Sequence, residues 1–145
     1  MWILDSSVAV KWFFTDEPLF KEANEVLDVL KVKPDSFLVP DLFYMEFCSA
    51  LLKKTSRDAK FVEEALSALY ELGIPAVPIG EKLLKEAIKI SNEFALSIYD
   101  SIYVSTAKEA HAKWLSSDMQ AIKKLMPDLA CLATNLNAIS RLNRD

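Results

Sequence analysis

The chain has 145 residues, of which 52% are hydrophobic and 26% charged, and this balance excludes a disordered linker. Two glycines are too few for the glycine-rich loops that bind nucleotide phosphates. One histidine and two cysteines supply too few ligands for a structural zinc site. A net charge of −4 argues, by itself, against a nucleic-acid partner. Carboxylate oxygens are therefore the main chemistry left to this sequence.

The features that the sequence lacks predict the compartment. Residues 1–5 have no basic residue and only a short apolar run, so we expect no signal peptide. No apolar segment approaches the length of a membrane span. Cys48 and Cys131 lie in apolar runs, which indicates buried thiols rather than a disulfide. We expect a cytoplasmic protein without membrane contact, folded as a single domain over residues 1–145.

Short apolar runs alternate with amphipathic segments along the whole chain. Short runs predict strands, and apolar residues three and four apart predict helices. In chain order we expect strands at 2–4, 37–39, 74–77, 114–115 and 129–131, and helices at 19–30, 42–52, 61–72, 83–95, 97–110 and 119–125. Prolines mark 74–77 as a sheet edge. Strands separated by helices predict an α/β fold with a parallel sheet covered on both faces.

Three acids, Asp5, Asp100 and Asp118, follow an apolar strand or open a helix. Each can be explained as a helix cap, because Asp is a favoured N-cap residue and Ser97 with Asp100 has the spacing of a capping box. The carboxyl ends of parallel strands share one edge of a sheet, where sites in such folds lie. We therefore expect Asp5 and Asp118 at that edge, with Asp100 opening a helix beside it.

Glu46 is the only charge in the apolar segment LFYMEFCSALL, residues 42–52. A carboxylate in such a helix requires an ion-pair partner, for which Lys11 is a candidate, or a metal ion. Four carboxylates that meet at one edge would repel one another without a cation, and hard oxygen ligands favour Mg²⁺ or Mn²⁺. A site of this kind, with one or two ions, suits phosphoryl chemistry, because the ion activates water and stabilises the leaving oxygen.

The sequence contains four short blocks in a fixed order: ILDSSVAVKWF (3–13), VPDLFYME (39–46), LSIYDSIY (96–103) and LSSD (115–118). Together these blocks resemble the PIN-domain ribonucleases of the VapC toxin type, over nearly the whole chain. The resemblance implies a PIN-like three-layer α/β/α sandwich with a central, mostly parallel five-stranded sheet. It also implies an endoribonuclease that hydrolyses RNA with Mg²⁺ or Mn²⁺, acts as the toxin of a toxin–antitoxin pair, binds a cognate antitoxin and forms a homodimer.

The resemblance further implies roles for individual residues. Its metal-binding and catalytic acids match Asp5, Glu46, Asp100 and Asp118. Ser7 and Ser116 match hydroxyl positions that support the acids, and Ser49 stands where members often have Asn. The fourth block begins with two serines where members commonly have Thr-Ala, and it keeps its carboxylate.

Basic residues near these blocks would have to carry RNA binding. The candidates are Lys11, Lys53, Lys54 and Arg57, with Lys60, Lys123 and Lys124 nearby in the sequence. Taken alone, each cluster favours a solvated helix face, and the functional alternative is a phosphate track beside the acids. The aromatic residues Trp12, Phe13 and Phe14 are expected in the core or at a dimer contact rather than stacked on bases.

Two other classes of protein are compatible with a small acidic α/β chain. A catalytically inactive PIN-fold module that binds RNA or protein would be favoured if one of the four acids were missing, and all four are present. A phospho-signalling receiver domain requires an acidic pair at the first strand and an acceptor Asp after the third. Here Ser6 and Ser7 follow Asp5, and residues 74–79 contain no Asp.

Overall fold

The structure is a computed structural model that describes residues 1–125 and 133–135. Five strands form one sheet in the order β3-β2-β1-β4-β5, and all neighbouring strands are parallel. They are β1 (Trp2–Leu4), β2 (Phe37–Pro40), β3 (Ala76–Val77), β4 (Lys113–Ser116) and β5 (Ala133–Asn135). β3 lies at the sheet edge, as its prolines predict, whereas the strand expected at 129–131 lies outside the described residues.

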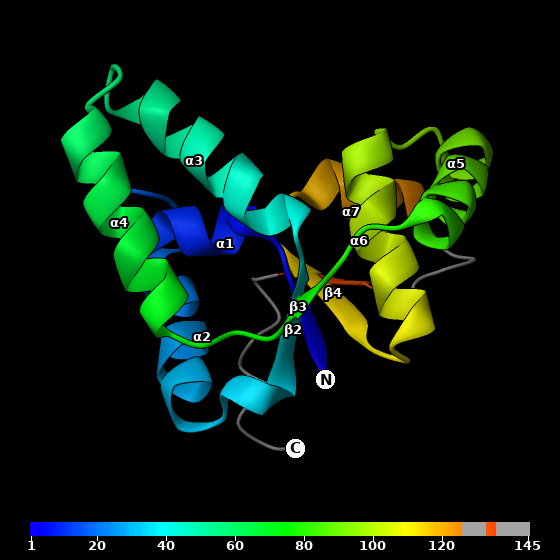
Figure 1. The fold of residues 1–145 in the computed structure, drawn as a ribbon, viewed down its shortest axis with the longest axis horizontal. Helices are drawn as coiled ribbons and strands as arrows, with labels where there is room; N and C mark the ends of the chain where they lie inside the picture. The colour runs from blue at the N-terminus through cyan, green and yellow to red at the C-terminus, as the bar shows by residue number, and fades with distance from the viewer. Residues whose placement is uncertain (126–132, 136–145) are drawn as a thin grey trace.

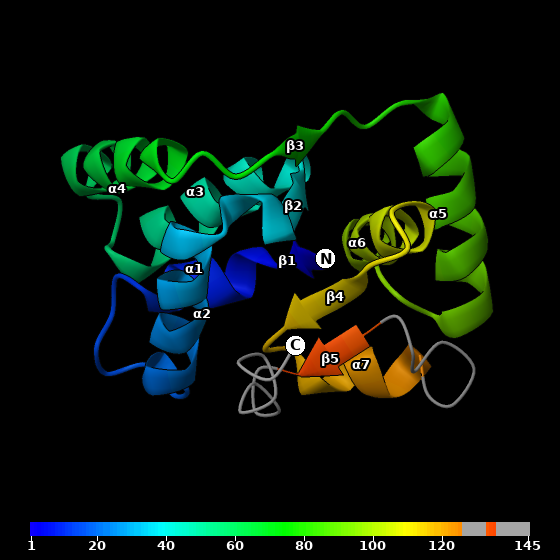
Figure 2. The ribbon, with the colours of Figure 1, turned by 90° about the horizontal axis from the view of Figure 1, so that it is seen from below.

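Helices connect the strands and cover both faces of the sheet. They are α1 (Ser6–Lys11), α2 (Phe20–Val32), the 3-10 turn η1 (Pro34–Ser36), α3 (Leu42–Lys54), α4 (Ala59–Glu71), α5 (Glu81–Phe94), α6 (Ile98–Glu109) and α7 (Met119–Leu125). Figure 1 and Figure 2 show α1 to α4 gathered on one side of the sheet and α5 and α6 on the other. The predicted three-layer sandwich is confirmed. Within the described residues, no helix has the length and apolar composition that a membrane crossing requires.

The core explains why such short strands are stable. Ile3 and Leu4 of β1 are fully buried, as expected for a strand with helices over both faces. Trp114 of β4 and Tyr103 of α6 are also fully buried, and their rings stack with centroids 6.0 Å apart. Cys48 on α3 is a half-buried free thiol, and Cys131 lies outside the described residues.

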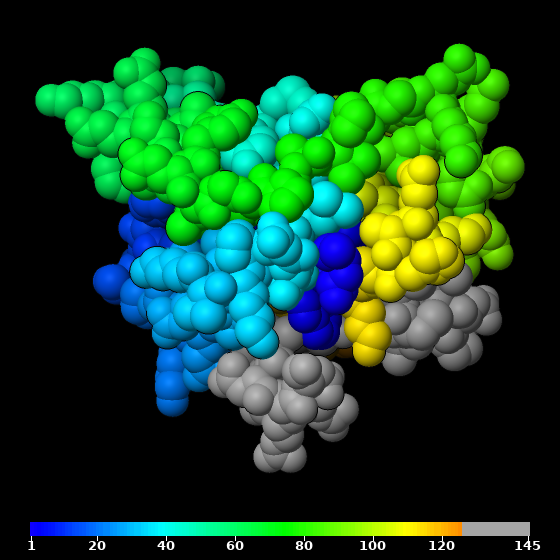
Figure 3. Space-filling view, turned by 60° about the horizontal axis from the view of Figure 1, so that its bottom comes forward, coloured from blue at the N-terminus to red at the C-terminus, as the bar shows by residue number. Residues whose placement is uncertain are grey.

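The two ends of the parallel strands are built differently. At the amino ends, Trp2 pairs with Phe37 on one side and with Lys113 on the other. Figure 3 shows the start of the chain wedged there between the segments that precede β2 and β4. At the carboxyl ends, β1 leads into Asp5 and β4 into Ser117. The strand order reverses between β1 and β4, and ligand sites of open α/β sheets lie at such a reversal.

Candidate active site

Asp5 lies at the carboxyl end of the central strand and is only 6% exposed. Its backbone N–H donates to the Leu115 carbonyl at 3.0 Å, which extends the β1–β4 pairing by one residue. Its Oδ2 accepts hydrogen bonds from Ser7 Oγ at 2.5 Å and from Ser116 Oγ at 2.9 Å. Although Asp5 precedes α1, its side chain makes no capping hydrogen bond to that helix. The helix-cap explanation is therefore wrong for Asp5.

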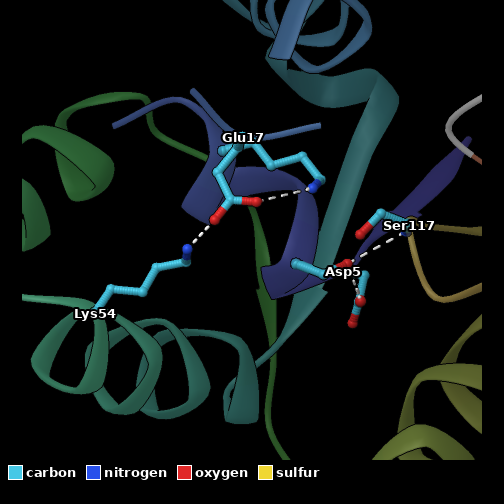
Figure 4. Close-up of polar contacts among 6 residues, drawn as sticks. Asp5, Glu17, Lys54 and Ser117 are labelled. Carbon is cyan, nitrogen blue, oxygen red and sulfur yellow. Dashed lines mark hydrogen bonds and ion pairs between the residues drawn. The ribbon is translucent and has the colours of Figure 1, made fainter. Parts of the chain in front are cut away.

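The same two serines connect Asp5 to the segment that leads to Asp118. Ser7 Oγ accepts from the Ser117 N–H at 3.2 Å (Figure 4), and Ser116 Oγ accepts from the Asp118 N–H at 3.0 Å. Each hydroxyl thus donates to the Asp5 carboxylate and accepts from the backbone after β4. This network holds the ends of β1 and β4 together across the point where the strand order reverses.

Asp118 and Asp100 lie at helix N-termini, as the sequence predicts. Asp118 Oδ1 accepts from the N–H groups of Gln120 and Ala121 at 3.0 and 3.1 Å, which caps α7. At the start of α6, Ser97 Oγ accepts from the Asp100 N–H at 3.0 Å, one half of a capping box. Capping uses only Oδ1 of Asp118, so its Oδ2 remains available for another contact.

Glu46 lies on α3, and within residues 1–125 and 133–135 its buried Oε1 has no hydrogen-bond partner. The hydroxyls of Tyr103 and Ser6 are near enough to lower the Glu46 pKa, but neither makes a full hydrogen bond with it. Lys11 forms its ion pair with Glu17 instead. The explanation of Glu46 as half of a Lys11 ion pair is therefore wrong.

Burial and repulsion between the acids raise the pKa values of Asp5, Glu46 and Asp100. Burial, the largest cause, raises the pKa of Asp5 to about 6 and that of Glu46 to about 7. The Asp100 charge contributes at both residues, and the Asp5 charge contributes at Glu46. The pKa of Asp100 is raised by burial and then by Asp118, with Lys124 opposing the rise. The structure thus brings the four predicted acids into one electrostatic cluster.

The chemistry of this cluster suits a hard divalent cation. Asp5 is buried and Glu46 is half-buried, and in the part of the chain that the structure describes the Glu46 Oε1 has no hydrogen-bond partner, so a bound cation would offset the repulsion among these acids. Over residues 1–125 and 133–135, no three acidic, histidine or cysteine side chains stand close enough together to hold an ion as they are placed. The donor types therefore fit a cation, and the side chains would have to close around it.

An open cleft with a volume of about 790 Å³ borders the cluster. One face of α3 lines it with Glu46, Ser49, Lys53 and Lys54, and the opposite side contributes Ser7, Lys11, Glu17, Tyr99 and Ser117. Three of the four basic residues predicted to bind RNA thus lie in the cleft. Arg57 does not, because α3 ends at Lys54 and the exposed Arg57 takes a left-handed φ of 69° in the following turn.

Three further residues belong to this region without having been predicted. Tyr103 lies three residues after Asp100 on α6, so helical spacing could have identified it. Its pKa is raised, first by burial and then by the charges of Asp5 and Glu46. Tyr99 lines the cleft with 55% of its surface exposed. Glu17 lies in the turn between α1 and α2, where no sequence pattern marks it.

The aromatic residues after α1 pack as predicted. Trp12, Phe13 and Phe14 are half-buried against the core. Trp12 Nε1 donates to the Ala23 carbonyl at 2.7 Å, and the Phe13 ring meets the Phe47 ring edge-on at 5.5 Å. These contacts attach the turn before α2 to α2 and α3.

Comparison with known proteins identifies the family. The family model of the PIN domain matches residues 2–125, which include all four acids of the cluster. The chain belongs to the PIN domain family. The resemblance seen in the four sequence blocks is thereby confirmed. Among curated protein sequences, none matches this PIN domain.

Solved structures with little sequence identity share this PIN-domain fold. One is PAE2754 from Pyrobaculum aerophilum, with a TM-score of 0.73 at 16% identity over 99% of this chain and 90% of that one. A toxin–antitoxin complex from Klebsiella pneumoniae has a TM-score of 0.64 at 15% identity, covering 94% of this chain and 98% of that one. FitAB bound to an IR36 DNA fragment has a TM-score of 0.68 at 15% identity, covering 94% and 95%.

Proposed function

We propose that this PIN domain is a metal-dependent endoribonuclease and the toxin of a toxin–antitoxin pair. The observation that carries the proposal is the cluster of Asp5, Glu46, Asp100 and Asp118 at the carboxyl edge, where burial and mutual repulsion raise the pKa values of Asp5, Glu46 and Asp100. A toxin–antitoxin complex among the similar structures supports the second part. A cognate antitoxin and a second copy of the chain are the protein partners that we expect.

The four acids would hold one or two Mg²⁺ or Mn²⁺ ions. When bound, such an ion offsets the charge of the phosphate, lowers the pKa of water and stabilises the leaving oxygen. Ser7 and Ser116 fix the Asp5 carboxylate by donating to its Oδ2, so that it need not reorganise when the ion arrives. Ser49 lies on the same cleft-facing side of α3 as Glu46 and would support it from there.

Glu46 is the residue best suited to move a proton. Its pKa is raised to about 7 without a metal ion, and a cation held by these acids would lower it, so Glu46 would be ionised at neutral pH and would accept a proton from water. Tyr103 stays neutral because its pKa is raised, and its buried hydroxyl, which has no hydrogen-bond partner among the described residues, is available to donate to Glu46. Lys11, Lys53 and Lys54 would attract the phosphates of the strand into the cleft.

A cleavage assay with matched variants tests the nuclease. We expect the purified protein to cut short single-stranded RNA in Mn²⁺ and to stop when EDTA is added. Asp5→Asn and Asp100→Asn should abolish cleavage while the thermal unfolding transition persists. Glu86→Gln, which neutralises an exposed acid paired with Lys108, serves as the control and should cut normally.

The outcomes separate the two candidate functions. Equal activity in wild type and Asp5→Asn would indicate a contaminating nuclease and contradict the proposal. RNA binding by the wild type without any cleavage would instead support the catalytically inactive binding module. The toxin role is tested separately: expression of the wild type should arrest growth, expression of Asp100→Asn should not, and co-expression of a cognate antitoxin should restore growth.

A further inference from the structure

One glutamate, Glu17, lines the cleft together with Lys11, Lys53 and Lys54. Glu17 pairs with Lys54 at the end of α3 (Figure 4) and also with Lys11 of α1. Lys11 Nζ is 3.6 Å from Glu17 Oε2, and Lys54 Nζ donates to Glu17 Oε1. The side chains of Glu17 and Lys11 are only 18% and 11% exposed. This is a partly desolvated group of three charges rather than a surface ion pair held loosely by water.

The two ammonium groups repel each other, and an anion between them offsets this repulsion. Burial lowers the pKa of Lys11, and the Lys54 charge lowers it further. Lys54 is also held from a second side, because its Nζ lies 5.0 Å from the centroid of the Phe14 ring. Two ammonium groups fixed in this way form a site for one anion, which the Glu17 carboxylate fills.

We propose that Glu17 is an internal substitute for an RNA phosphate, and that a phosphodiester of the substrate displaces it from Lys11 and Lys54. This inference rests on the proposed function, because it assigns a phosphate subsite in the same cleft. The three residues line the cleft together with Glu46, so a strand that reaches the acidic cluster passes them. Lys53 lines the cleft as well and adds a third positive charge beside the subsite.

The exchange requires only a side-chain rotation. The Glu17 backbone is held by two hydrogen bonds of its own, from its N–H to the Phe14 carbonyl at 3.1 Å and from the Phe20 N–H to its carbonyl at 3.2 Å. The turn can therefore keep its shape while the carboxylate leaves the lysines. Because Glu17 is attached to the same chain, it competes at a high effective concentration. RNA that binds weakly would not displace Glu17, whereas a strand that makes further contacts along the cleft would displace it.

RNA binding without cleavage tests the displacement. The probe is a 12-nucleotide fluorescein-labelled single-stranded RNA, titrated with protein in EDTA and followed by fluorescence anisotropy. We expect Glu17→Gln to bind about five- to tenfold more tightly than wild type, because two ion pairs no longer have to be broken. The matched control Glu86→Gln removes the same charge from the groove between α5 and α6 and should change affinity less than about twofold, because screening weakens remote charges.

Lys54→Gln shows whether the gain arises at this subsite. The single variant should bind more weakly, and its affinity should depend less on salt, by about 0.7 in the logarithmic slope for one lost phosphate contact. In the double variant Glu17→Gln/Lys54→Gln, the gain from Glu17→Gln should shrink to the level of Glu86→Gln. Lys54 is 39% exposed, so its replacement leaves the core intact and keeps the test valid if Glu17→Gln proves unstable.

The inference is overturned if Glu17→Gln binds RNA no more tightly than Glu86→Gln, or if the gain persists without Lys54. It is also overturned if Glu17→Gln changes the affinity for the co-expressed antitoxin and leaves RNA binding unaltered, since the displacing anion would then be an acidic side chain of a protein. Cleavage in Mn²⁺ is measured separately. If Glu17→Gln binds RNA more tightly but no variant cleaves it, the proposed phosphate subsite is supported and the proposed nuclease activity is contradicted.

Discussion

Two regions of this PIN domain place lysines and acids side by side, with opposite electrostatic results. In the groove between α5 and α6, Glu86 accepts a hydrogen bond from Lys108 at 2.6 Å, and Glu81 pairs with Lys85 at 2.7 Å. The Lys108 hydrogen bond holds the pKa of Glu86 below its usual value. At the carboxyl edge of the sheet, by contrast, Asp5 and its neighbouring acids have raised pKa values.

The comparison shows that residue types alone do not make a site. Both regions contain the same kinds of side chain, and the difference lies in exposure to water. Acids on the open helix surfaces pair with lysines. Asp5 and the half-buried Glu46, by contrast, are desolvated and lie near other acids, and both effects raise their pKa values. An arrangement that lowers stability in this way indicates a functional site, because perturbed carboxylates in a cleft are typical of catalysis. Four experiments test this difference between the two regions.

The largest expected effect is on metal affinity. Asp5→Asn and Asp100→Asn should weaken Mn²⁺ binding by about 100-fold or more, because each removes a charged oxygen donor. Glu86→Gln should leave Mn²⁺ binding unchanged, since lysines already neutralise that acid. Isothermal titration calorimetry of the three variants measures this difference. Equal Mn²⁺ affinity in wild type and Asp100→Asn would remove the distinction between the two regions.

The second effect is on the pH dependence of stability without metal. Asp5 and Glu46 titrate near 6 and 7 in the folded protein, compared with 3.8 and 4.5 as unperturbed groups. The folded state therefore binds more protons than the unfolded state in this range, and stability falls as pH rises. In EDTA we expect a loss on the order of 2 kcal/mol between pH 5 and pH 8, measured by urea unfolding.

Asp5→Asn should reduce this pH dependence and should be more stable than wild type at pH 8, because it carries no buried charge. Glu86→Gln should act in the opposite direction, since the depressed pKa of Glu86 means that its ionised form favours folding. An Asp5→Asn variant that is less stable than wild type at pH 8 would show that burial of the carboxylate is not destabilising.

A third, smaller effect concerns the hydroxyls around Asp5. Ser116→Ala removes one of the two donors to Asp5 Oδ2, and should cost about 1 kcal/mol of stability and shift Mn²⁺ binding to higher pH. Ser105→Ala is the matched control, because Ser105 is equally buried and its Oγ has no hydrogen-bond partner in the part of the chain that the structure describes. Urea unfolding and Mn²⁺ titrations across pH compare the two. Identical behaviour would mean that the serine network does not tune Asp5.

The smallest effect is expected in the α5–α6 groove itself. Lys85→Ala breaks the exposed ion pair with Glu81, one helical turn away, and should change the free energy of unfolding by only about 0.3 kcal/mol. RNA cleavage should stay at the wild-type level. A large effect on either measurement would give this groove a role that its solvated ion pairs do not suggest.

Much of the fold and part of the site follow from sequence patterns. Strand ends predict the positions of Asp5 and Asp118 because parallel strands share an edge, and a lone charge in an apolar helix identifies Glu46. α1 escapes prediction because six residues contain too few apolar repeats. The positions of the Glu17 and Arg57 side chains depend on turns with left-handed backbone, near Leu19 at φ 64° and at Arg57 itself. Such turns set the direction of the chain but leave no periodic pattern in the sequence.

The hydrogen bond between Ser116 and Asp5 joins residues 111 positions apart. During synthesis, the first half of the sheet can form from β1, β2 and β3, but Asp5 has no contact with Ser116 or Asp118 until β4 has been translated and has paired with β1. A nascent chain therefore carries its acids unassembled until β4 has joined the sheet. In a protein proposed to cut RNA, this order of assembly would delay activity until the sheet is complete.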